Sequence, residues 1–230
     1  MQAVILAGGL GTRLRPITES IPKSMIRIGG KPFLEYQINL LKQNGILDVV
    51  LCVGHLHEQI ENYFANGNKW GVSLTYSYEV SELLGTGGAI KNAEHYLKDE
   101  FFVMYGDSYL PINFKSVYRF FKEKGAIATM VVYKNECRYD RSNVILKGER
   151  IVVYDKKNPL PQMQYIDYGL SVISKRVLDI IPKGVFYDVA DAFGVLAAKG
   201  DLLGYEVKER FYEIGSFKGL KEFNEYIRGG

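Results

Sequence analysis

The chain has 230 residues, 47% of them hydrophobic, enough to bury a full core and close to the upper end of what one domain usually contains. Its 29 basic and 26 acidic residues leave a formal charge of only +3, without the basic run that marks a nucleic-acid-binding arm. No apolar run approaches the roughly 20 residues that a membrane helix needs, so neither nucleic acid nor a membrane is an expected partner.

Cysteine usage bears on the compartment. Cys52 and Cys137 lie far apart in the sequence and suggest reduced thiols instead of a disulfide framework. No basic leader precedes the apolar stretch at residues 3–6, so we expect a cytoplasmic protein. The residues do not fix the number of subunits, and a homo-oligomer stays open.

Short β-rich runs alternate with helical patterns through the first half, which predicts a largely parallel sheet flanked by helices. The predicted elements, in chain order, are a strand at 3–6, a helix at 33–43, a strand at 46–53, a helix at 57–64, a strand at 74–78, a helix at 89–97 and a strand at 101–105.

The second half is richer in strands. After a predicted helix at 114–124, β-rich runs follow at 127–133, 143–146, 151–154 and 166–173, then helices at 175–181, 189–199 and 217–227 with one strand at 203–207. With little room for helices between them, the β-rich runs suggest antiparallel additions to the same sheet. We expect an α/β fold, a Rossmann-like three-layer sandwich with a mixed, mainly parallel central sheet. A single domain spans 1–230, with halves of about 1–110 and 111–230.

A glycine-rich loop follows the first strand. Its glycines let backbone N–H groups approach a phosphate, and it lies at the carboxyl end of a strand, where open α/β sheets bind ligands. The candidate nucleotide-binding residues here are Leu6, Ala7, Gly8, Gly9, Gly11 and Thr12. A dinucleotide fingerprint fails because its third glycine position is Leu14, and no Gly-Lys-Ser/Thr follows for a Walker loop. A glycine turn that only reverses the chain remains the alternative.

The loop continues to Arg13, and ten residues later the chain reads Ile21-Pro22-Lys23. This two-part pattern resembles the signature of the sugar-phosphate nucleotidylyltransferase family. The resemblance implies that Arg13 and Lys23 are catalytic and neutralise charge on the α- and β-phosphates of a nucleoside triphosphate. Read alone, Lys23 would be a solvated surface lysine.

A second glycine motif, Leu84-Gly85-Thr86-Gly87-Gly88, resembles the family loop that packs against the base and ribose. The resemblance implies nucleotide-binding roles for Gly85, Thr86 and Gly88, with main-chain groups reading the edge of the base. Its form is most like the branch that uses GTP with mannose or heptose 1-phosphates. A flexible turn ahead of a helix is the plain alternative.

Asp107 follows the strand at 101–105, after Gly106. The resemblance implies that it is a Mg²⁺ ligand; otherwise it would cap a turn. The second family metal ligand lies in an Asp-x-Gly-Thr context, where this chain has Glu213-Ile214-Gly215-Ser216. Glu213 is one methylene longer than aspartate and could reach the ion directly or through water. Because Mg²⁺ binds few protein carboxylates, these two acids suffice.

The resemblance also covers the sugar-phosphate half. Lys156, with Lys157 as its alternative, matches a lysine that contacts the sugar phosphate, unless this charged loop is simply solvated. Asn143, Asp167 and Gly169 fall where the family contacts sugar hydroxyls.

The expected activity is the transfer of a nucleoside monophosphate from a triphosphate, with GTP favoured, to a sugar 1-phosphate of mannose or heptose type. Mg²⁺ is the expected cofactor, and the products are pyrophosphate and a nucleotide sugar of the kind used for cell-surface polysaccharides. Two alternatives remain: cytidylyl or other nucleotidylyl transfer to a different phosphorylated small molecule, and a non-catalytic sensor of the same fold.

Overall fold

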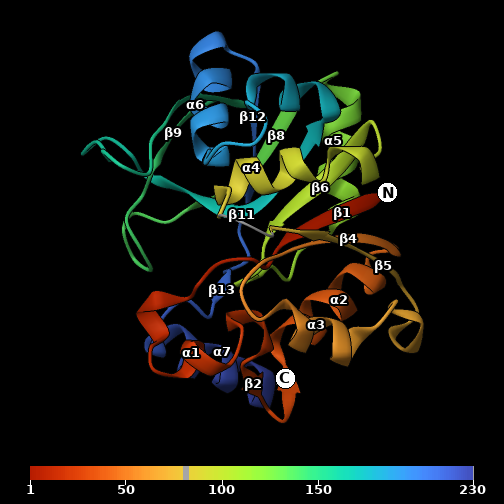
Figure 1. The fold of residues 1–230 in the computed structure, drawn as a ribbon. Helices are drawn as coiled ribbons and strands as arrows, with labels where there is room; N and C mark the ends of the chain where they lie inside the picture. Colours follow the sequence, from red (N-terminus) through yellow and green to blue (C-terminus); the bar gives the residue numbers. More distant parts are fainter. Residues whose placement is uncertain (80–82, 230) are drawn as a thin grey trace.

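The computed structural model describes residues 1–79 and 83–229, which build one nine-stranded sheet with the order β5-β4-β1-β6-β11-β8-β12-β10-β9 (Figure 1). Its strands are β1 (Gln2–Leu6), β4 (Asp48–Val53), β5 (Ser73–Tyr78), β6 (Glu100–Tyr105), β8 (Ala128–Lys134), β9 (Val144–Lys147), β10 (Arg150–Tyr154), β11 (Tyr165–Ser174) and β12 (Leu202–Val207). Strands β5, β4, β1 and β6 pair in parallel, as do β8 and β12. Strands β11 and β10 run against their neighbours.

The predicted mixed sheet is therefore confirmed, but parallel pairing dominates only among its first four strands. The second half of the chain enters the same sheet through β11, which lies between β6 and β8. Because β11 runs opposite to both, the additions from the β-rich region are mostly antiparallel, as its pattern indicated.

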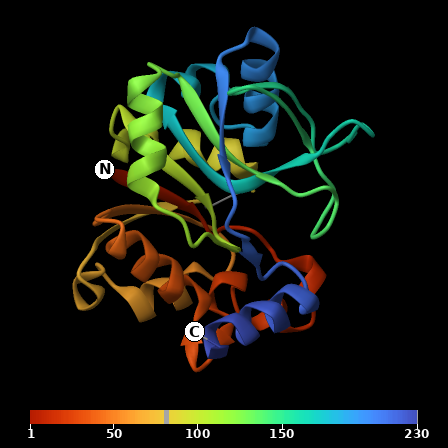
Figure 2. The same cartoon turned by 180° about the vertical axis from the view of Figure 1, so that it is seen from behind.

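Helices cover both faces of the sheet (Figures 1 and 2). They are α2 (Phe33–Gln43), α3 (His57–Phe64), α4 (Gly85–Asn92), α5 (Phe114–Glu123) and α6 (Val189–Lys199). Along β1, Ala3 and Ile5 pack with α2, α3 and α5, whereas Val4 packs with α4 and α6. Successive residues of a strand point to opposite faces, so the apolar run from Ala3 to Leu6 contributes side chains to both cores.

Two predicted helices differ from the structure. The helix expected at 89–97 begins four residues earlier, at Gly85, and ends at Asn92, with a 3₁₀ turn (Glu94–Tyr96) after it. The glycine motif can enter the helix because the Tyr187 carbonyl accepts hydrogen bonds from the N–H groups of Gly87 and Gly88. The helix expected at 175–181 is a 3₁₀ helix (Lys175–Ile180), and Pro182 follows closely. Three further 3₁₀ turns are Thr12–Leu14, Lys23–Met25 and Asn68–Trp70.

A smaller unit of structure lies below the sheet in Figure 1. It contains α1 (Ile17–Ser20), α7 (Phe217–Gly229) and two short ribbons, β2 (Arg27–Ile28) with β3 (Lys31–Pro32) and β7 (Ser108–Tyr109) with β13 (Tyr212–Glu213). Phe223 of α7 packs edge-on against Phe33, with ring centroids 5.1 Å apart. A third hydrophobic cluster, which includes Leu14 and Ile214, thus fixes the last helix against the N-terminal loops.

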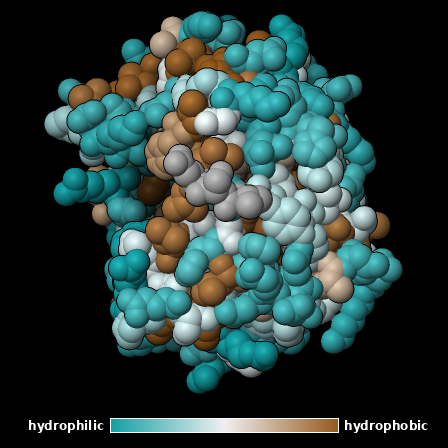
Figure 3. Space-filling model, in the orientation of Figure 1, coloured by the Kyte–Doolittle hydropathy of each residue, from teal (hydrophilic) through white to brown (hydrophobic). Residues whose placement is uncertain are grey.

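Polar side chains cover most of the face seen in Figure 3, and hydrophobic ones gather in a band left of its centre. Across residues 1–79 and 83–229, every helix is too short or too polar to span a lipid bilayer.

Candidate active site

Four parallel strands end at the same edge of the sheet. Leu6 of β1 is level with Cys52 and Tyr105, and Val53 is level with Tyr78. The segments that follow these strands therefore meet: the glycine-rich loop, Glu79 and the Gly106-Asp107 pair. Gly106 donates its N–H to the Leu6 carbonyl over 3.0 Å, and a Cβ at this position would collide with that same oxygen. Only glycine allows so close an approach.

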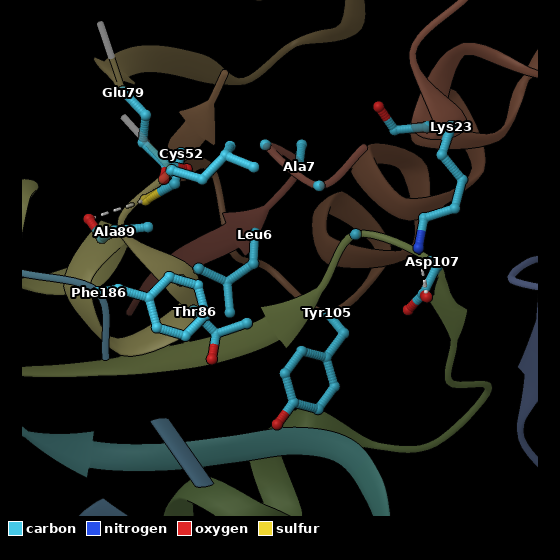
Figure 4. Close-up of a pocket in the computed structure, with 16 residues that line it drawn as sticks. Leu6, Ala7, Lys23, Cys52, Glu79, Thr86, Ala89, Tyr105, Asp107 and Phe186 are labelled. Atoms are coloured by element: carbon cyan, nitrogen blue, oxygen red, sulfur yellow. Dashed lines mark hydrogen bonds and ion pairs between the residues drawn. The ribbon is translucent and has the colours of Figure 1, made fainter. Parts of the chain in front are cut away.

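A cavity of about 280 Å³ opens at this edge (Figure 4). Six of the predicted nucleotide-binding residues line it: Leu6, Ala7, Gly8, Gly9, Gly85 and Thr86. Lys23 and Asp107 lie at one end of the cavity, and Glu79 and Phe186 lie toward the other in this view. Two motifs that are 70 residues apart in the sequence thus form one wall.

Three predicted nucleotide-binding residues are not among those that line this cavity: Gly11, Thr12 and Gly88. Gly11 has a φ of +62°, and a Cβ there would lie 2.9 Å from the Thr18 methyl group, so its glycine serves the turn. The Tyr187 carbonyl accepts hydrogen bonds from the N–H groups of Gly87 (2.8 Å) and Gly88 (3.1 Å). These two N–H groups already have an acceptor, so a reading of the base by main-chain groups of this motif stays a prediction that would fall to its other backbone atoms.

Thr86 also has internal partners. Its hydroxyl donates to Asp188 Oδ1 over 2.7 Å and accepts the Val189 N–H over 2.9 Å. The second glycine motif therefore joins the N-terminus of α4 to the segment that leads into α6.

The predicted cations and acids converge. Lys23 Nζ lies 2.7 Å from Asp107 Oδ2, and both side chains are largely buried. The space beside Gly215 shows the rest of the cluster, because a Cβ there would lie 2.7 Å from Arg13 Nη2, 2.8 Å from Glu213 Oε2 and 3.4 Å from Asp107 Oδ2. Arg13, Lys23, Asp107 and Glu213 thus surround one small volume, although they come from separate parts of the chain.

Asp107 is held by its surroundings. Buried Gln37 donates from one amide nitrogen to the carbonyls of Tyr105 (2.9 Å) and Ser108 (2.8 Å), which fixes the turn that carries Asp107. Burial opposes ionisation of this carboxyl, but the charges of Lys23 and Arg13 and the hydrogen bonds from Lys23 and Ser108 lower the pKa of Asp107 below its ordinary 3.8. Asp107 is therefore a carboxylate at neutral pH, as a metal ligand must be.

Glu213 reaches the cluster through the β7–β13 ribbon, in which it pairs with Ser108. Its carboxylate accepts hydrogen bonds from the Gly215 N–H and, over 2.5 Å, from the Ser216 hydroxyl. Gly219 in the first turn of α7 leaves room for it, because a Cβ there would overlap the carboxylate. The longer side chain of Glu213, relative to aspartate, is thus accommodated because it bends back onto the turn at Gly215 and Ser216.

These two acids suit a hard divalent ion. Within the described residues no group of three or more His, Cys, Asp or Glu forms a metal cluster. Mg²⁺ needs none, because it is usually held by one or two carboxylates together with water and phosphate oxygens. Asp107 and Glu213 fit that donor set.

A second cavity, of about 580 Å³, lies beyond this cluster. All four predicted sugar-side residues line it: Asn143, Lys156, Asp167 and Gly169. Arg13 and Glu213 line it too, and Tyr105 and Asp107 border both cavities. The two cavities thus share the end of β6 as a common wall.

Asp167 is buried in a hydrogen-bond network. Its Oδ2 accepts from the Tyr154 hydroxyl over 2.8 Å and lies 3.0 Å from Lys156 Nζ, and its Oδ1 accepts the Gly169 N–H over 2.9 Å. Asn143 Oδ1 accepts the Asp167 N–H over 2.9 Å. Asp167 therefore positions Lys156 in this structure, and its contact with sugar hydroxyls stays a prediction.

Lys156 is the cation of the second cavity. Its Nζ lies 2.8 Å from the Tyr105 hydroxyl and 4.3 Å from the centre of that ring. Burial disfavours the charged form, but Tyr105 and Asp167 outweigh it and raise the pKa of Lys156. Lys157, the alternative, instead pairs with Asp191 at the surface, 2.8 Å away.

Glu79 and Phe186 are among the residues of the first cavity that the sequence analysis missed. Glu79 accepts the Leu84 N–H over 2.7 Å and faces Gly8, where a Cβ would collide with its carboxylate. Burial raises the pKa of Glu79. One signal was available for Glu79: an acid directly after a parallel strand, at the edge that carries the glycine-rich loop. No local signal points to Phe186.

Comparison with known proteins gives a consistent result. The nucleotidyl transferase family matches residues 2–224. A UTP--glucose-1-phosphate uridylyltransferase of Synechocystis sp. is 34% identical over 100% of this chain and 63% of its own length. A D-glycero-alpha-D-manno-heptose 1-phosphate guanylyltransferase of Campylobacter jejuni is 47% identical over 49% of this chain and 50% of its own length.

The matched regions thus cover 63% and 50% of the length of these two relatives. Among solved structures, HddC from Yersinia pseudotuberculosis complexed with GMP-PN superimposes with a TM-score of 0.80 at 26% identity, over 98% of this chain and 99% of that one.

Proposed function

We propose that this chain, which belongs to the nucleotidyl transferase family, transfers a nucleoside monophosphate from a triphosphate to a sugar 1-phosphate and releases pyrophosphate. The helices on both faces of the sheet favour the Rossmann-like three-layer arrangement as its scaffold. The proposal includes a cytoplasmic setting. The division into a nucleotide half at about 1–110 and a sugar-phosphate half at about 111–230 stays a prediction. Each cavity takes residues from both halves, since Phe186 lines the first and Arg13 the second.

One observation carries the proposal: a cluster of Arg13, Lys23, Asp107 and Glu213 lies where two cavities meet. A triphosphate in the first cavity would bring its phosphates to Lys23, and a sugar phosphate in the second would lie near Lys156. The reacting phosphorus and oxygen would then meet beside Asp107.

The chemistry follows from this placement. An oxygen of the sugar phosphate forms a bond to the α-phosphorus, and the bond from that phosphorus to the bridging oxygen of pyrophosphate breaks. The attacking oxygen is already anionic, so no general base is required. Arg13 and Lys23 stabilise the charge that develops on the phosphates. Asp107 and Glu213 would hold Mg²⁺, which supplies further positive charge to the triphosphate when bound.

Glu79 favours GTP as the triphosphate. Guanine presents two adjacent N–H donors on its Watson–Crick edge, and a carboxylate accepts two such hydrogen bonds side by side. Uracil, thymine and cytosine place acceptors next to their donors, so they would face the Glu79 carboxylate with a repulsive contact. The guanylyltransferase of Campylobacter jejuni and the complex of HddC with GMP-PN agree with this choice.

The relative from Campylobacter jejuni is named a heptose 1-phosphate guanylyltransferase, which favours a mannose- or heptose-type 1-phosphate as the acceptor. The test is to incubate the protein with Mg²⁺, each of GTP, CTP, UTP, ATP and dTTP, and a panel of sugar 1-phosphates, and to measure pyrophosphate. We expect release with GTP and a mannose- or heptose-type phosphate.

The E79Q variant is the matched control for base choice, since glutamine keeps the size but offers one acceptor and one donor. We expect its preference for GTP over UTP to fall by about tenfold or more, the cost of losing one good charged hydrogen bond. Release with CTP and a non-sugar phosphate would instead support another nucleotidylyl transfer. Binding of nucleotide without any pyrophosphate release would support a sensor.

A further inference from the structure

Phe186 is exposed to an unusual degree. Its relative exposure of 71% is the largest among the large hydrophobic residues that the structure describes as exposed. Such a side chain contributes little to folding stability, because most of its apolar surface stays in water. Isolated exposed apolar residues are common, so exposure alone decides nothing. Phe186, however, also lines the nucleotide cavity, so its exposed ring is available to a ligand bound there.

The ring borders that cavity. Its Cε2 and Cζ atoms would lie 3.2 Å from a Cβ on Gly85, so the ring rests against the glycine at the start of α4. Figure 4 shows it beside Leu6 and Thr86, away from Glu79. Phe186 and Glu79 line the same cavity, and a planar group between them would meet an apolar face and a carboxylate.

The backbone directly after Phe186 is held by hydrogen bonds. The Tyr187 N–H donates to the Leu84 carbonyl over 2.8 Å, and the Tyr187 carbonyl accepts from Gly87 and Gly88. Asp188 accepts a hydrogen bond from the Thr86 hydroxyl. A side chain that is exposed on a rigid backbone is already positioned for a ligand, so its ordering costs little on binding.

From this arrangement we propose that Phe186 packs against the purine face of bound GTP, while Glu79 accepts from the purine edge. The inference rests on the proposed function. It adds a binding residue that lies 102 residues after Leu84, the start of the second glycine motif, and 178 residues after Gly8 of the first loop. Aromatic stacking is tolerant of base identity, because every base has a π face. Phe186 therefore supplies affinity, and Glu79 supplies the choice of base.

The test compares three variants of the full chain. F186A removes the ring, F186W keeps a larger one, and V185A removes the neighbouring side chain, which is 46% exposed and is not among the residues that line the cavity. Calorimetry with Mg²⁺ measures the Kd of GTP and, separately, of pyrophosphate, which has no base to stack. Urea unfolding checks that each variant folds.

We expect F186A to weaken GTP by roughly tenfold, the loss that alanine typically causes at a stacking aromatic. Its Kd for pyrophosphate should stay within twofold of the parent, F186W should retain GTP affinity, and V185A should bind both like the parent. Addition of GTP should also quench the fluorescence that F186W has in excess of the parent.

Two results would overturn the inference. GTP affinity of F186A within twofold of the parent would show that the ring does not contact the base, even if the parent is an active guanylyltransferase. An equal loss of GTP and pyrophosphate affinity would show a structural effect instead of stacking. If the parent protein binds no triphosphate at all, the proposed function fails with it.

Discussion

Replacement of Lys23 by alanine tests the centre of the proposed site. Lys23 Nζ lies 2.7 Å from Asp107 Oδ2, and the side chains of the two residues keep only 20% and 23% of their surface exposed. If Lys23 is one preorganised donor to the phosphates, its loss should lower turnover by about 10² to 10³, or about 2.7–4 kcal/mol of transition-state stabilisation. Because both side chains are largely buried, the loss of Lys23 should also lower folding stability, by about 1–3 kcal/mol.

The assay is pyrophosphate release at saturating GTP, sugar 1-phosphate and Mg²⁺, with urea unfolding as the stability measurement. K31A is the matched control, because Lys31 also pairs with a carboxylate, Glu35 at 3.5 Å, but its side chain is 56% exposed. K31A should keep turnover within twofold. Turnover of K23A within a few-fold of the parent would remove Lys23 from the mechanism.

A Mg²⁺ titration separates two ways in which Lys23 could act. If Lys23 only holds Asp107 in place, K23A should need more Mg²⁺ and recover most of its turnover when the ion saturates. If Lys23 contacts the phosphates, the deficit should remain at saturating Mg²⁺, which is the result we expect.

Three further predictions concern the rest of the site. Burial raises the pKa of Glu79 in the free protein, so GTP binding to the carboxylate must expel a proton when the pH is below that pKa. The affinity for GTP should therefore fall as the pH drops through the pKa of Glu79, and the affinity of E79Q should not change over the same pH range. G106A should lower the free energy of unfolding by about 2 kcal/mol or more, because a Cβ there collides with the Leu6 carbonyl. G9A is the control, because a Cβ at Gly9 meets open space, and its free energy of unfolding should change by less than about 1 kcal/mol. D167N should lose about 3 kcal/mol of folding stability, because it leaves Lys156 without its buried partner, and a loss below about 1 kcal/mol would contradict that network.

The parts of the fold that depend on local pattern were predictable. The apolar strand at β1 and the helix α2 follow from runs and periodicity, and the change to antiparallel pairing follows from β-rich segments without helices between them. The short ribbons were not predictable. A two-residue pair such as β7 with β13 depends on a contact between segments about 100 residues apart, which no local pattern encodes.

Some residues of the candidate site were also predictable from the sequence, and others were not. Arg13, Lys23 and Asp107 sit in motifs whose spacing carries a signature, and the structure brings them together. Main-chain groups of the second glycine motif were predicted to read the base, and that role stays a prediction. The N–H groups of Gly87 and Gly88 donate to the carbonyl of Tyr187, which is distant in the sequence, so no local pattern could show this contact. Phe186 enters the cavity through that same docking, so sequence reasoning had no basis on which to find it.

The wall that Tyr105 and Asp107 form between the two cavities has a kinetic consequence. A nucleotide sugar would occupy both cavities at once, whereas each substrate occupies one. Under the proposed function its escape must break the contacts of both ends, so we expect the sugar nucleotide to leave more slowly than either substrate.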